Sequence, residues 1–439
     1  MGKRVSRRSF LRAGVVAGAT AVGMPHFIPA RAMGANNRIV LGGIGVGNQG
    51  SGLVRAFARS CDVAAIADVY LPRAEEIAKS VGAKHVYQDY RKLLERQDID
   101  AVIVATPIHW HALNCIHAAQ AGKDIFCEKP LSYSILEGRR IVEAVRKYRR
   151  VLQTGIQQRS GRTEYDGIMH VRNGTLGKLT RVVATNFYSP MEPRHPEQAV
   201  PEGLDWDMWC GPAEPPPYNY VIWDNRSNPS WVSIRPFSGG NMSDRGGHGL
   251  DVAQWGMGLD DSGPEEVWVE GEPFETMYST PDNPGGRQRG VGSPKVWMRF
   301  PGDVLLELGD GPDWSGVRFI GEKGSITVTR GHASSDPPEL IAEPVADPEV
   351  ELYQSPGHHR DWLDCIRERR DPVAPAEAGH RSATICNLGN IVRWVSEVTG
   401  ETGQRLRWDA VNERFTNSPE GNRFLHRPER SEYALPDQV

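Results

Sequence analysis

The stretch "RIVLGGIGVGNQG", residues 38–50, decides the fold. An apolar run typical of a buried strand leads into a glycine turn of the form G-x-G-x-x-G, and a helical pattern follows. This order predicts a dinucleotide-binding βαβ unit, in which a glycine lets the backbone approach a pyrophosphate at the helix N-terminus. A glycine-rich turn without a ligand is the alternative. The expected contacts are Gly45, Gly47, Asn48, Gln49 and Gly50.

The pattern around this stretch predicts two domains. From Arg38 to about Arg159, short β-branched runs alternate with helical segments, which indicates a Rossmann domain with a doubly wound parallel sheet over residues 36–158. Residues 159–416 have longer loops and strand-like runs, typical of an α+β domain built on a large, mostly antiparallel open sheet. Residues 417–439 are polar and contain several prolines, so we expect a C-terminal arm. The predicted fold class is α/β.

Asp68 ends the second predicted strand, where a carboxylate can accept hydrogen bonds from an adenosine ribose. A carboxylate at this place favours NAD over NADP, because it repels a 2'-phosphate. Asp68 could also cap the helix expected to begin near Pro72.

The fourth predicted strand ends in "ATPIHWHALN", residues 105–114. A loop at the carboxyl end of a parallel strand faces the ligand crevice. Its two histidines could be a metal pair, but no acid or cysteine lies near them in the sequence, so packing against the cofactor or helix capping is favoured. We therefore expect no metal here and cofactor contacts from Thr106, Pro107, His109 and His111.

The fifth predicted strand ends in "CEKP", residues 127–130, so Glu128 and Lys129 should also face the crevice. An ammonium group there can bind a substrate hydroxyl and stabilise a developing alkoxide. A surface lysine paired with Glu128 is the alternative. The Lys129–Pro130 peptide bond is a candidate for the cis isomer.

A second cluster of polar residues lies in "SDRGGHGLDVAQWGMG", residues 243–258. If this segment is one helix, its polar residues and Trp255 share a face: Asp244, His248, Asp251 and Trp255. His248 is a plausible base for a sugar hydroxyl, with its imidazolium stabilised by Asp244 or Asp251. The alternative is an ordinary polar helix face.

The glycine turn, "ATPIHWH", "CEKP" and the Asp-x-x-x-His of residues 244–248 together resemble the Gfo/Idh/MocA oxidoreductases, over nearly the whole chain. The family is named for glucose-fructose oxidoreductase and inositol dehydrogenase. "QTGIQQRS" and "SPGHHRDWLDCIR" resemble a Tat-exported branch of it that acts on sugars or glycosides. The resemblance implies that Glu128 and Lys129 position the nicotinamide and the substrate, and that Asp244 and His248 are an acid/base pair. Expected at the substrate are Lys129, Gln157, Arg159, Asp244, His248 and Asp251.

The N-terminal stretch "SRRSFLRAGVVAGATAVG", residues 6–23, carries a twin arginine before a short apolar run, and small residues follow at Ala30 and Ala32. This layout predicts a Tat signal peptide over residues 1–32 and a periplasmic or otherwise exported protein, with the Tat translocase as a partner during export. The apolar run is shorter than the ~20 residues of a spanning helix, which argues against a stable membrane anchor.

Charge and cysteine usage exclude several classes of protein. Removing the six positive charges of residues 1–32 from a net charge of −4 leaves −10, which argues against nucleic acid as a partner. The six cysteines show no CxxC or zinc-type spacing, so we expect buried thiols, no disulfide framework and no structural metal.

These observations predict an NAD-dependent oxidoreductase that oxidises a ring hydroxyl, or reduces a ketone, of a sugar or glycoside, with a tightly bound and recycled cofactor. One alternative is an NAD-dependent glycosidase, although such relatives tend to lose the lysine that stands here as Lys129. A non-catalytic sugar-binding protein is the second. A homodimer or homotetramer is expected, with the C-terminal arm reaching over a neighbouring subunit.

Overall fold

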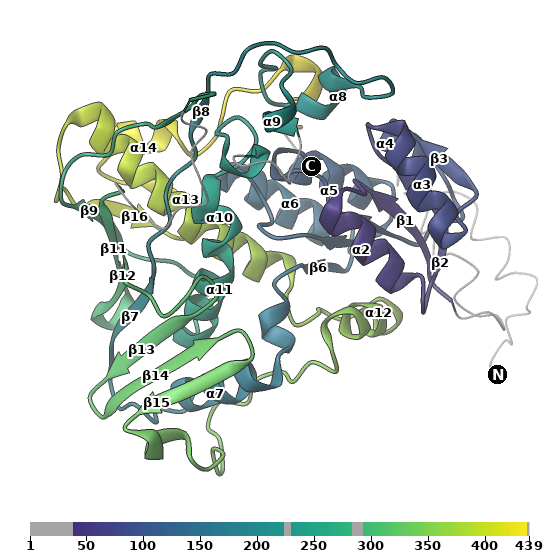
Figure 1. The fold of residues 1–439 in the computed structure, drawn as a ribbon. Coiled ribbons are helices and arrows are strands. Elements are labelled where there is room, and N and C mark those ends of the chain that lie inside the picture. Colours follow the sequence, from purple (N-terminus) through teal and green to yellow (C-terminus); the bar gives the residue numbers. More distant parts are fainter. Residues whose placement is uncertain (1–37, 224–229, 283–292, 437–438) are drawn as a thin grey trace, which may run out of the picture. The chain divides into compact units, whose positions relative to one another are not determined.

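A computed structural model describes residues 38–223, 230–282, 293–436 and 439 (Figure 1). The predicted export signal, residues 1–32, lies outside these ranges. Residues 38–439 form one compact unit. Within the described ranges, no helix combines the length and the apolar character needed to cross a bilayer.

Six strands form a parallel sheet in the order β3-β2-β1-β4-β5-β6, which confirms the predicted Rossmann domain. Strands β4 and β5 are buried along their whole length, as expected when helices cover both faces of a sheet. The strands are β1 (Val40–Ile44), β2 (Asp62–Ala67), β3 (His85–Tyr87), β4 (Ala101–Val104), β5 (Asp124–Cys127) and β6 (Leu152–Thr154). The main helices are α2 (Asn48–Phe57), α3 (Leu71–Val81), α4 (Tyr90–Leu94), α5 (His111–Gln120) and α6 (Ile135–Lys147).

The strand order reverses between β1 and β4, which are neighbours in the sheet. At such a switch point the loops that follow the two strands lead away to opposite faces and leave a crevice at the carboxyl ends. The loops that begin at Gly45 and Ala105 border this crevice, so the fold itself positions the predicted cofactor contacts.

The second sheet has nine strands in the order β15-β14-β13-β7-β12-β11-β9-β16-β17. Only β7 and β12 pair in parallel among these described strands, so the predicted mostly antiparallel sheet is confirmed. The strands are β7 (Leu179–Thr185), β9 (Glu266–Glu270), β11 (Lys295–Phe300), β12 (Val304–Gly309), β13 (Val317–Gly321), β14 (Gly324–Thr329), β15 (His332–Asp336), β16 (Leu406–Asp409) and β17 (Arg414–Phe415). A separate pair is formed by β8 (Glu192–Pro193) and β10 (Tyr278–Ser279).

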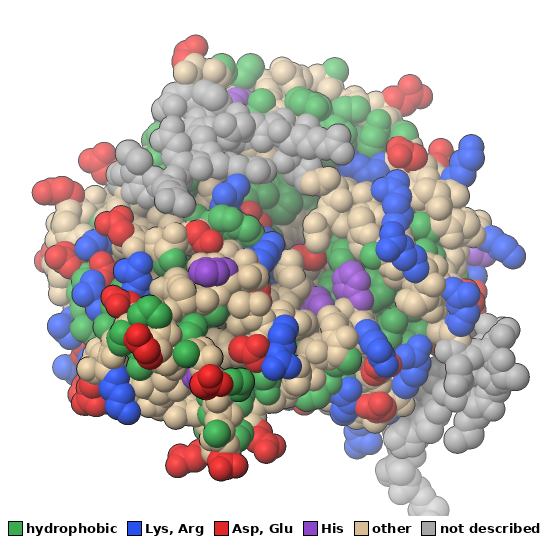
Figure 2. All heavy atoms as spheres, turned by 60° about the horizontal axis from the view of Figure 1, so that its bottom comes forward, with side chains coloured by type: hydrophobic (Ala, Val, Ile, Leu, Met, Phe, Trp, Pro, Cys, Tyr) green, Lys and Arg blue, Asp and Glu red, His purple; other side chains and the backbone are tan. Residues whose placement is uncertain are grey.

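Helices cover one face of the nine-stranded sheet (Figure 1). In β11 the side chains of Val296, Met298 and Phe300 are fully buried against them, while the alternate residues face the other side. Acidic and basic side chains are interspersed over the face of the molecule in Figure 2. The covering helices are α7 (Arg162–Arg172), α11 (Gly246–Met257) and α13 (Ala376–Thr399).

The segment expected to be one helix over residues 243–258 is divided in the structure. Helix α10 (Gly240–Asp244) ends at Asp244, and α11 begins at Gly246 after Arg245. Asp244 therefore lies at the end of α10, and it does not share a helix face with Asp251 of α11.

The described residues of the C-terminal segment pack on their own chain, and the expected reach over a neighbouring subunit stays a prediction. After α14 (Pro419–Arg423), the Tyr433 ring lies 5.3 Å from that of Trp110, and Arg430 pairs with Asp207 at 2.6 Å. These contacts place the segment against both domains.

Candidate active site

A cavity of about 700 Å³ lies at the carboxyl ends of the parallel strands, a volume that suits a small-molecule ligand. One end is lined by the loops after β1, β2 and β4, and the other by Lys129, Asp244 and His248. Aromatic residues of the second domain complete the wall: Tyr220, Trp223 and Trp231.

The glycine turn has the shape that a pyrophosphate requires. Gly45 has a φ of +75°, and a Cβ there would lie 2.7 Å from the Thr106 nitrogen, so only glycine fits. At Gly47 a Cβ would meet nothing closer than an Arg73 nitrogen at 3.8 Å, which leaves open space over the turn. Helix α2 begins at Asn48 without a side-chain cap, so its first N–H groups can bind an anion. The turn therefore fits the diphosphate of NAD.

Asp68 is fixed at the edge of the same turn. Its carboxylate accepts N–H groups from Val46 and Tyr70, both at 2.9 Å, and Arg73 lies 3.7 Å away. Tyr70 is the N-cap residue of α3 and that helix has no side-chain cap, so the capping role considered for Asp68 is not confirmed. The predicted ribose contact stays a prediction.

The loop after β4 contributes in part as expected. Thr106, Pro107 and His111 line the cavity, but His109 is fully buried away from it, with Nε2 2.9 Å from the Trp209 carbonyl oxygen. His111 has its ring nitrogens 2.9 Å from the Pro130 and Thr106 oxygens, which fixes the loop against the strand β5 end. Burial lowers the pKa of His109 to about 3 and that of His111 to about 4. His109 therefore packs in the interior, and the cofactor contact expected from it is wrong.

Glu128 links the glycine turn to the substrate end. Its Oε1 accepts from Gln49 Nε2 at 3.0 Å, and its Oε2 accepts from the backbone N–H of Lys129 at 3.2 Å. Burial raises the pKa of this carboxyl, against the opposing effect of the Lys129 charge.

Lys129 crosses from the first domain to the second. The Lys129–Pro130 bond is cis, as predicted. The Nζ atom donates to Asp244 Oδ1 at 2.7 Å and to the Asp244 carbonyl oxygen at 2.9 Å. The structure thus brings together two of the three predicted catalytic residues.

His248 lines the cavity beside them, but its neighbour is a cation. Arg330 Nη2 lies 3.3 Å from His248 Nδ1, and the Trp314 ring packs edge-on at 5.3 Å. Burial first, then the charges of Lys129 and Arg330, lower the pKa of His248 well below its usual value. The expectation that Asp244 or Asp251 stabilises a His248 imidazolium is therefore wrong: both carboxylates pair with other cations.

The hydrogen bond to Arg330 also sets the state of the imidazole. A guanidinium can only donate, so Nδ1 must accept and the neutral ring carries its proton on Nε2. Nε2 has no protein partner among the described residues and remains available to a ligand in the cavity.

The remaining predicted substrate contacts divide in two. Gln157 lines the cavity. Arg159 and Asp251 do not: they form a bidentate pair, with side chains 2% and 1% exposed, that Asp260 extends. Their charges satisfy each other in the interior, so the expected substrate contacts from these two residues are wrong.

Sequence reasoning missed Arg330 and Asn114. Arg330 follows β14 in a turn with Gly331 and is 82 residues from the histidine it contacts, so no spacing in the sequence connects the two. Asn114 accepts from Thr106 Oγ1, and its Nδ2 is buried without a protein partner among the described residues. Asn114 is the last residue of the quoted stretch "ATPIHWHALN", and its position near the loop could have drawn attention to it.

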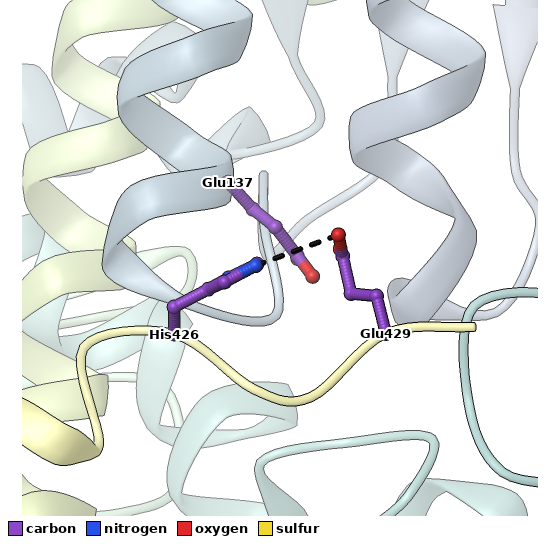
Figure 3. Close-up of side chains that lie close together, drawn as sticks. All are labelled: Glu137, His426 and Glu429. Carbon is purple, nitrogen blue, oxygen red and sulfur yellow. Dashed lines mark ion pairs between the residues drawn. The ribbon is translucent and has the colours of Figure 1, made fainter. Parts of the chain in front are cut away.

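One group of side chains has metal-like spacing. Glu137 of α6 converges with His426 and Glu429 of the C-terminal segment (Figure 3). However, Glu137 already accepts from Arg427 Nε at 2.9 Å and from the Tyr133 nitrogen at 3.0 Å. A cation in contact with the carboxylate opposes metal binding, so the group is an anchor for the C-terminal segment.

Two family models match the chain. One, described as "Oxidoreductase family, NAD-binding Rossmann fold", matches residues 39–156. The other, described as "Oxidoreductase family, C-terminal alpha/beta domain", matches residues 176–280 and 305–435. The N-terminal domain is thus an NAD-binding domain, in agreement with the shape of its glycine turn.

Known proteins resemble the chain in part. Myo-inositol 2-dehydrogenase of Thermotoga maritima is 28% identical over 243 residues, 55% of this chain and 58% of the relative. Alpha-N-acetylgalactosaminidase of Shewanella oneidensis is 34% identical over 179 residues, 38% of this chain and 36% of the relative. The chain thus matches about half or less of the length of these relatives. The solved aldose-aldose oxidoreductase of Caulobacter crescentus shares the fold, with a TM-score of 0.57 and 17% identity over 84% of this chain and 99% of that one.

Proposed function

Because the chain belongs to the Gfo/Idh/MocA family of oxidoreductases, we propose that it interconverts a ring hydroxyl and a ketone of a sugar or glycoside with NAD. The observation that carries this proposal is the shared cavity. Lys129, Asp244 and His248 line the same cavity as the glycine turn at Gly45. When bound, NAD supplies the hydride acceptor or donor.

Lys129 binds the reacting oxygen. Its ammonium is oriented by Asp244 and stabilises negative charge on that oxygen. For oxidation, the substrate hydroxyl proton passes to the Lys129–Asp244 pair: Asp244 takes a proton from the ammonium, and the resulting amine accepts the hydroxyl proton.

His248 complements this pair as a donor. With its proton on Nε2, it donates a hydrogen bond to the same oxygen and stabilises an alkoxide or a ketone there. This differs from the role expected from the sequence, in which His248 takes the hydroxyl proton.

We also propose that NAD stays bound between turnovers and travels with the folded protein through Tat export to the periplasm. Support comes from Arg73, whose guanidinium lies close to Gly47 and 5.2 Å from the Trp223 ring of the second domain. Contacts that close over a bound nucleotide slow its release. Oxidation of one sugar is then coupled to reduction of another compound.

Purification from periplasm without added cofactor tests this retention. The denatured protein should release close to one NAD(H) per chain. A protein that is empty and needs added NAD for each turnover would defeat the retention proposal.

A glycosidase is the second candidate, favoured by the similarity to alpha-N-acetylgalactosaminidase. Lys129 supports the dehydrogenase instead, because the family resemblance implies that glycosidases of this fold tend to lose this lysine. Incubation of the NAD-loaded protein with aryl glycosides separates the two: a dehydrogenase forms a ketone, a glycosidase releases the aglycone, and a binding protein does neither.

We propose a homodimer or homotetramer in solution. The outer face of the nine-stranded sheet carries stacked Trp268 and Trp297, 6.3 Å apart, flanked by Arg181 and Arg405. Such a surface of aromatic and arginine side chains is typical of interfaces. Light scattering at micromolar concentration tests the proposal, and a monomeric mass would refute it.

A further inference from the structure

Four flexible cationic side chains line the cavity, and one of them differs from the rest. Three lie within 4.0 Å of a carboxylate, whereas Arg330 has no carboxylate at that distance among the described residues. The three pairs are Arg55 with Glu76 at 4.0 Å, Arg73 with Asp68 at 3.7 Å and Lys129 with Asp244 at 2.7 Å. Among these four, Arg330 is thus the solvent-exposed cation without a carboxylate in direct contact, and it lies beside His248 at the substrate end.

Arg330 is nevertheless held in place. Its guanidinium lies 4.6 Å from the Trp314 ring, donates from Nη2 to His248, and its backbone nitrogen donates to Ser315 Oγ at 3.2 Å. Stacking on an aromatic ring fixes the plane of a guanidinium. Its Nε and Nη1 atoms have no acceptor within the described parts of the chain, so one edge remains open to a ligand.

The carboxylates around Arg330 accept hydrogen bonds from other residues. Glu164 accepts from the Gly331 nitrogen at 3.1 Å, and Asp313 accepts from Ser315. Glu128 binds Gln49, as described above. Burial lowers the pKa of Arg330, and the charges of these carboxylates oppose that effect only in part; none of them offers Arg330 a bidentate partner.

We propose that Arg330 binds a carboxylate of the substrate, so that the preferred substrates are acidic sugars of the uronic acid class. The guanidinium contacts Nδ1 of His248, and the other nitrogen of the same ring, Nε2, donates to the reacting oxygen. The carboxylate therefore lies on the same sugar ring as the reacting hydroxyl. The inference rests on the proposed function, since it takes this end of the cavity as the substrate end.

Calorimetry on the NAD-loaded protein tests the inference without turnover. The ligands are D-glucuronate and D-galacturonate, compared with D-glucose and D-galactose. We expect at least one uronate to bind about tenfold or more tightly than its neutral sugar, because only the uronate can form a charge-assisted bidentate pair with the guanidinium. Arg330→Gln should abolish this preference, so that the uronate and its neutral sugar bind to the variant with affinities within about twofold of each other.

Arg318→Gln is the matched control, because it removes one exposed arginine from β13, outside the cavity. It should change neither affinity. Equal binding of acidic and neutral sugars to the wild type would overturn the inference, as would a preference for the uronate that persists in Arg330→Gln. Tighter binding of glucose 6-sulfate than of either uronate would overturn the assignment to a carboxylate.

The failure of this inference differs from that of the proposed function. Ketone formation from neutral glycosides, without a preference for uronates, would refute the role of Arg330 alone. Tight uronate binding that depends on Arg330, with no ketone formed from any sugar, would refute the proposed oxidation alone.

Discussion

Two ion pairs connect the end of the parallel sheet to the same helical stretch, and they differ in access to ligands. Lys129 and Asp244 lie 2.7 Å apart with side chains 16% and 27% exposed, whereas Arg159 and Asp251 lie 2.8 Å apart at 2% and 1%. Both pairs have similar distances and charges. Only the first borders the cavity, so only the first can exchange its partner for a substrate.

The contribution of the buried Arg159–Asp251 pair to stability depends on both partners being present. Burial raises the pKa of Asp251, and the charge of Arg159 opposes this effect. A buried ion pair adds little over an apolar substitute, but removal of one partner leaves an expensive isolated charge. The cavity pair, which solvent reaches, avoids most of that cost.

The largest expected effect separates the two aspartates. Asp251→Asn should lower the free energy of unfolding by about 3 kcal/mol, because Arg159 loses its most buried partner. Asp244→Asn should lower it by less than about 1 kcal/mol and reduce turnover instead. Urea denaturation and initial rates measure both. Equal losses of stability in the two variants would remove the distinction.

The next effect concerns Lys129 itself. Lys129→Met should reduce turnover roughly a hundredfold, as expected when a positioned acid/base group is lost, with the fold intact by circular dichroism. Lys323→Met, the same change at an exposed turn between β13 and β14, is the matched control and should keep the wild-type rate. A wild-type rate in Lys129→Met would contradict the assignment.

The smallest effect is a pH dependence of stability that comes from His248. Its folded pKa lies well below the value of about 6.5 in the unfolded chain, so below pH 6.5 the unfolded state binds the extra proton and stability falls. His248→Asn removes this contribution. Between pH 6.5 and 5.5 the variant should therefore lose about 1 kcal/mol less than the wild type. Equal slopes in urea titrations at these pH values would show that His248 is not held neutral.

The backbone of the fold was predictable because it depends on local patterns. The glycine turn at Gly45 and the apolar runs of the parallel strands are contiguous in the sequence, and each implies its own geometry. The end of β5 was equally local, which is why the placement of Lys129 could be anticipated.

Side-chain partners were less predictable because they depend on distant segments. Helical spacing placed His248 and Asp251 on one face, but could not show that Arg159 meets Asp251 in the interior. Nor could it show that Arg330 meets His248 from a strand turn. His109 and His111 illustrate the same limit, since two residues of separation put one ring in the interior and the other at the cavity.

Mass spectrometry of the products formed from a panel of glycosides and uronides by the NAD-loaded protein tests the central claim most directly. The account predicts a product that has lost two hydrogens from a ring carbinol, formed by the wild type and reduced about a hundredfold in Lys129→Met. Release of the aglycone with an unoxidised sugar, or equal product from the two proteins, would contradict it.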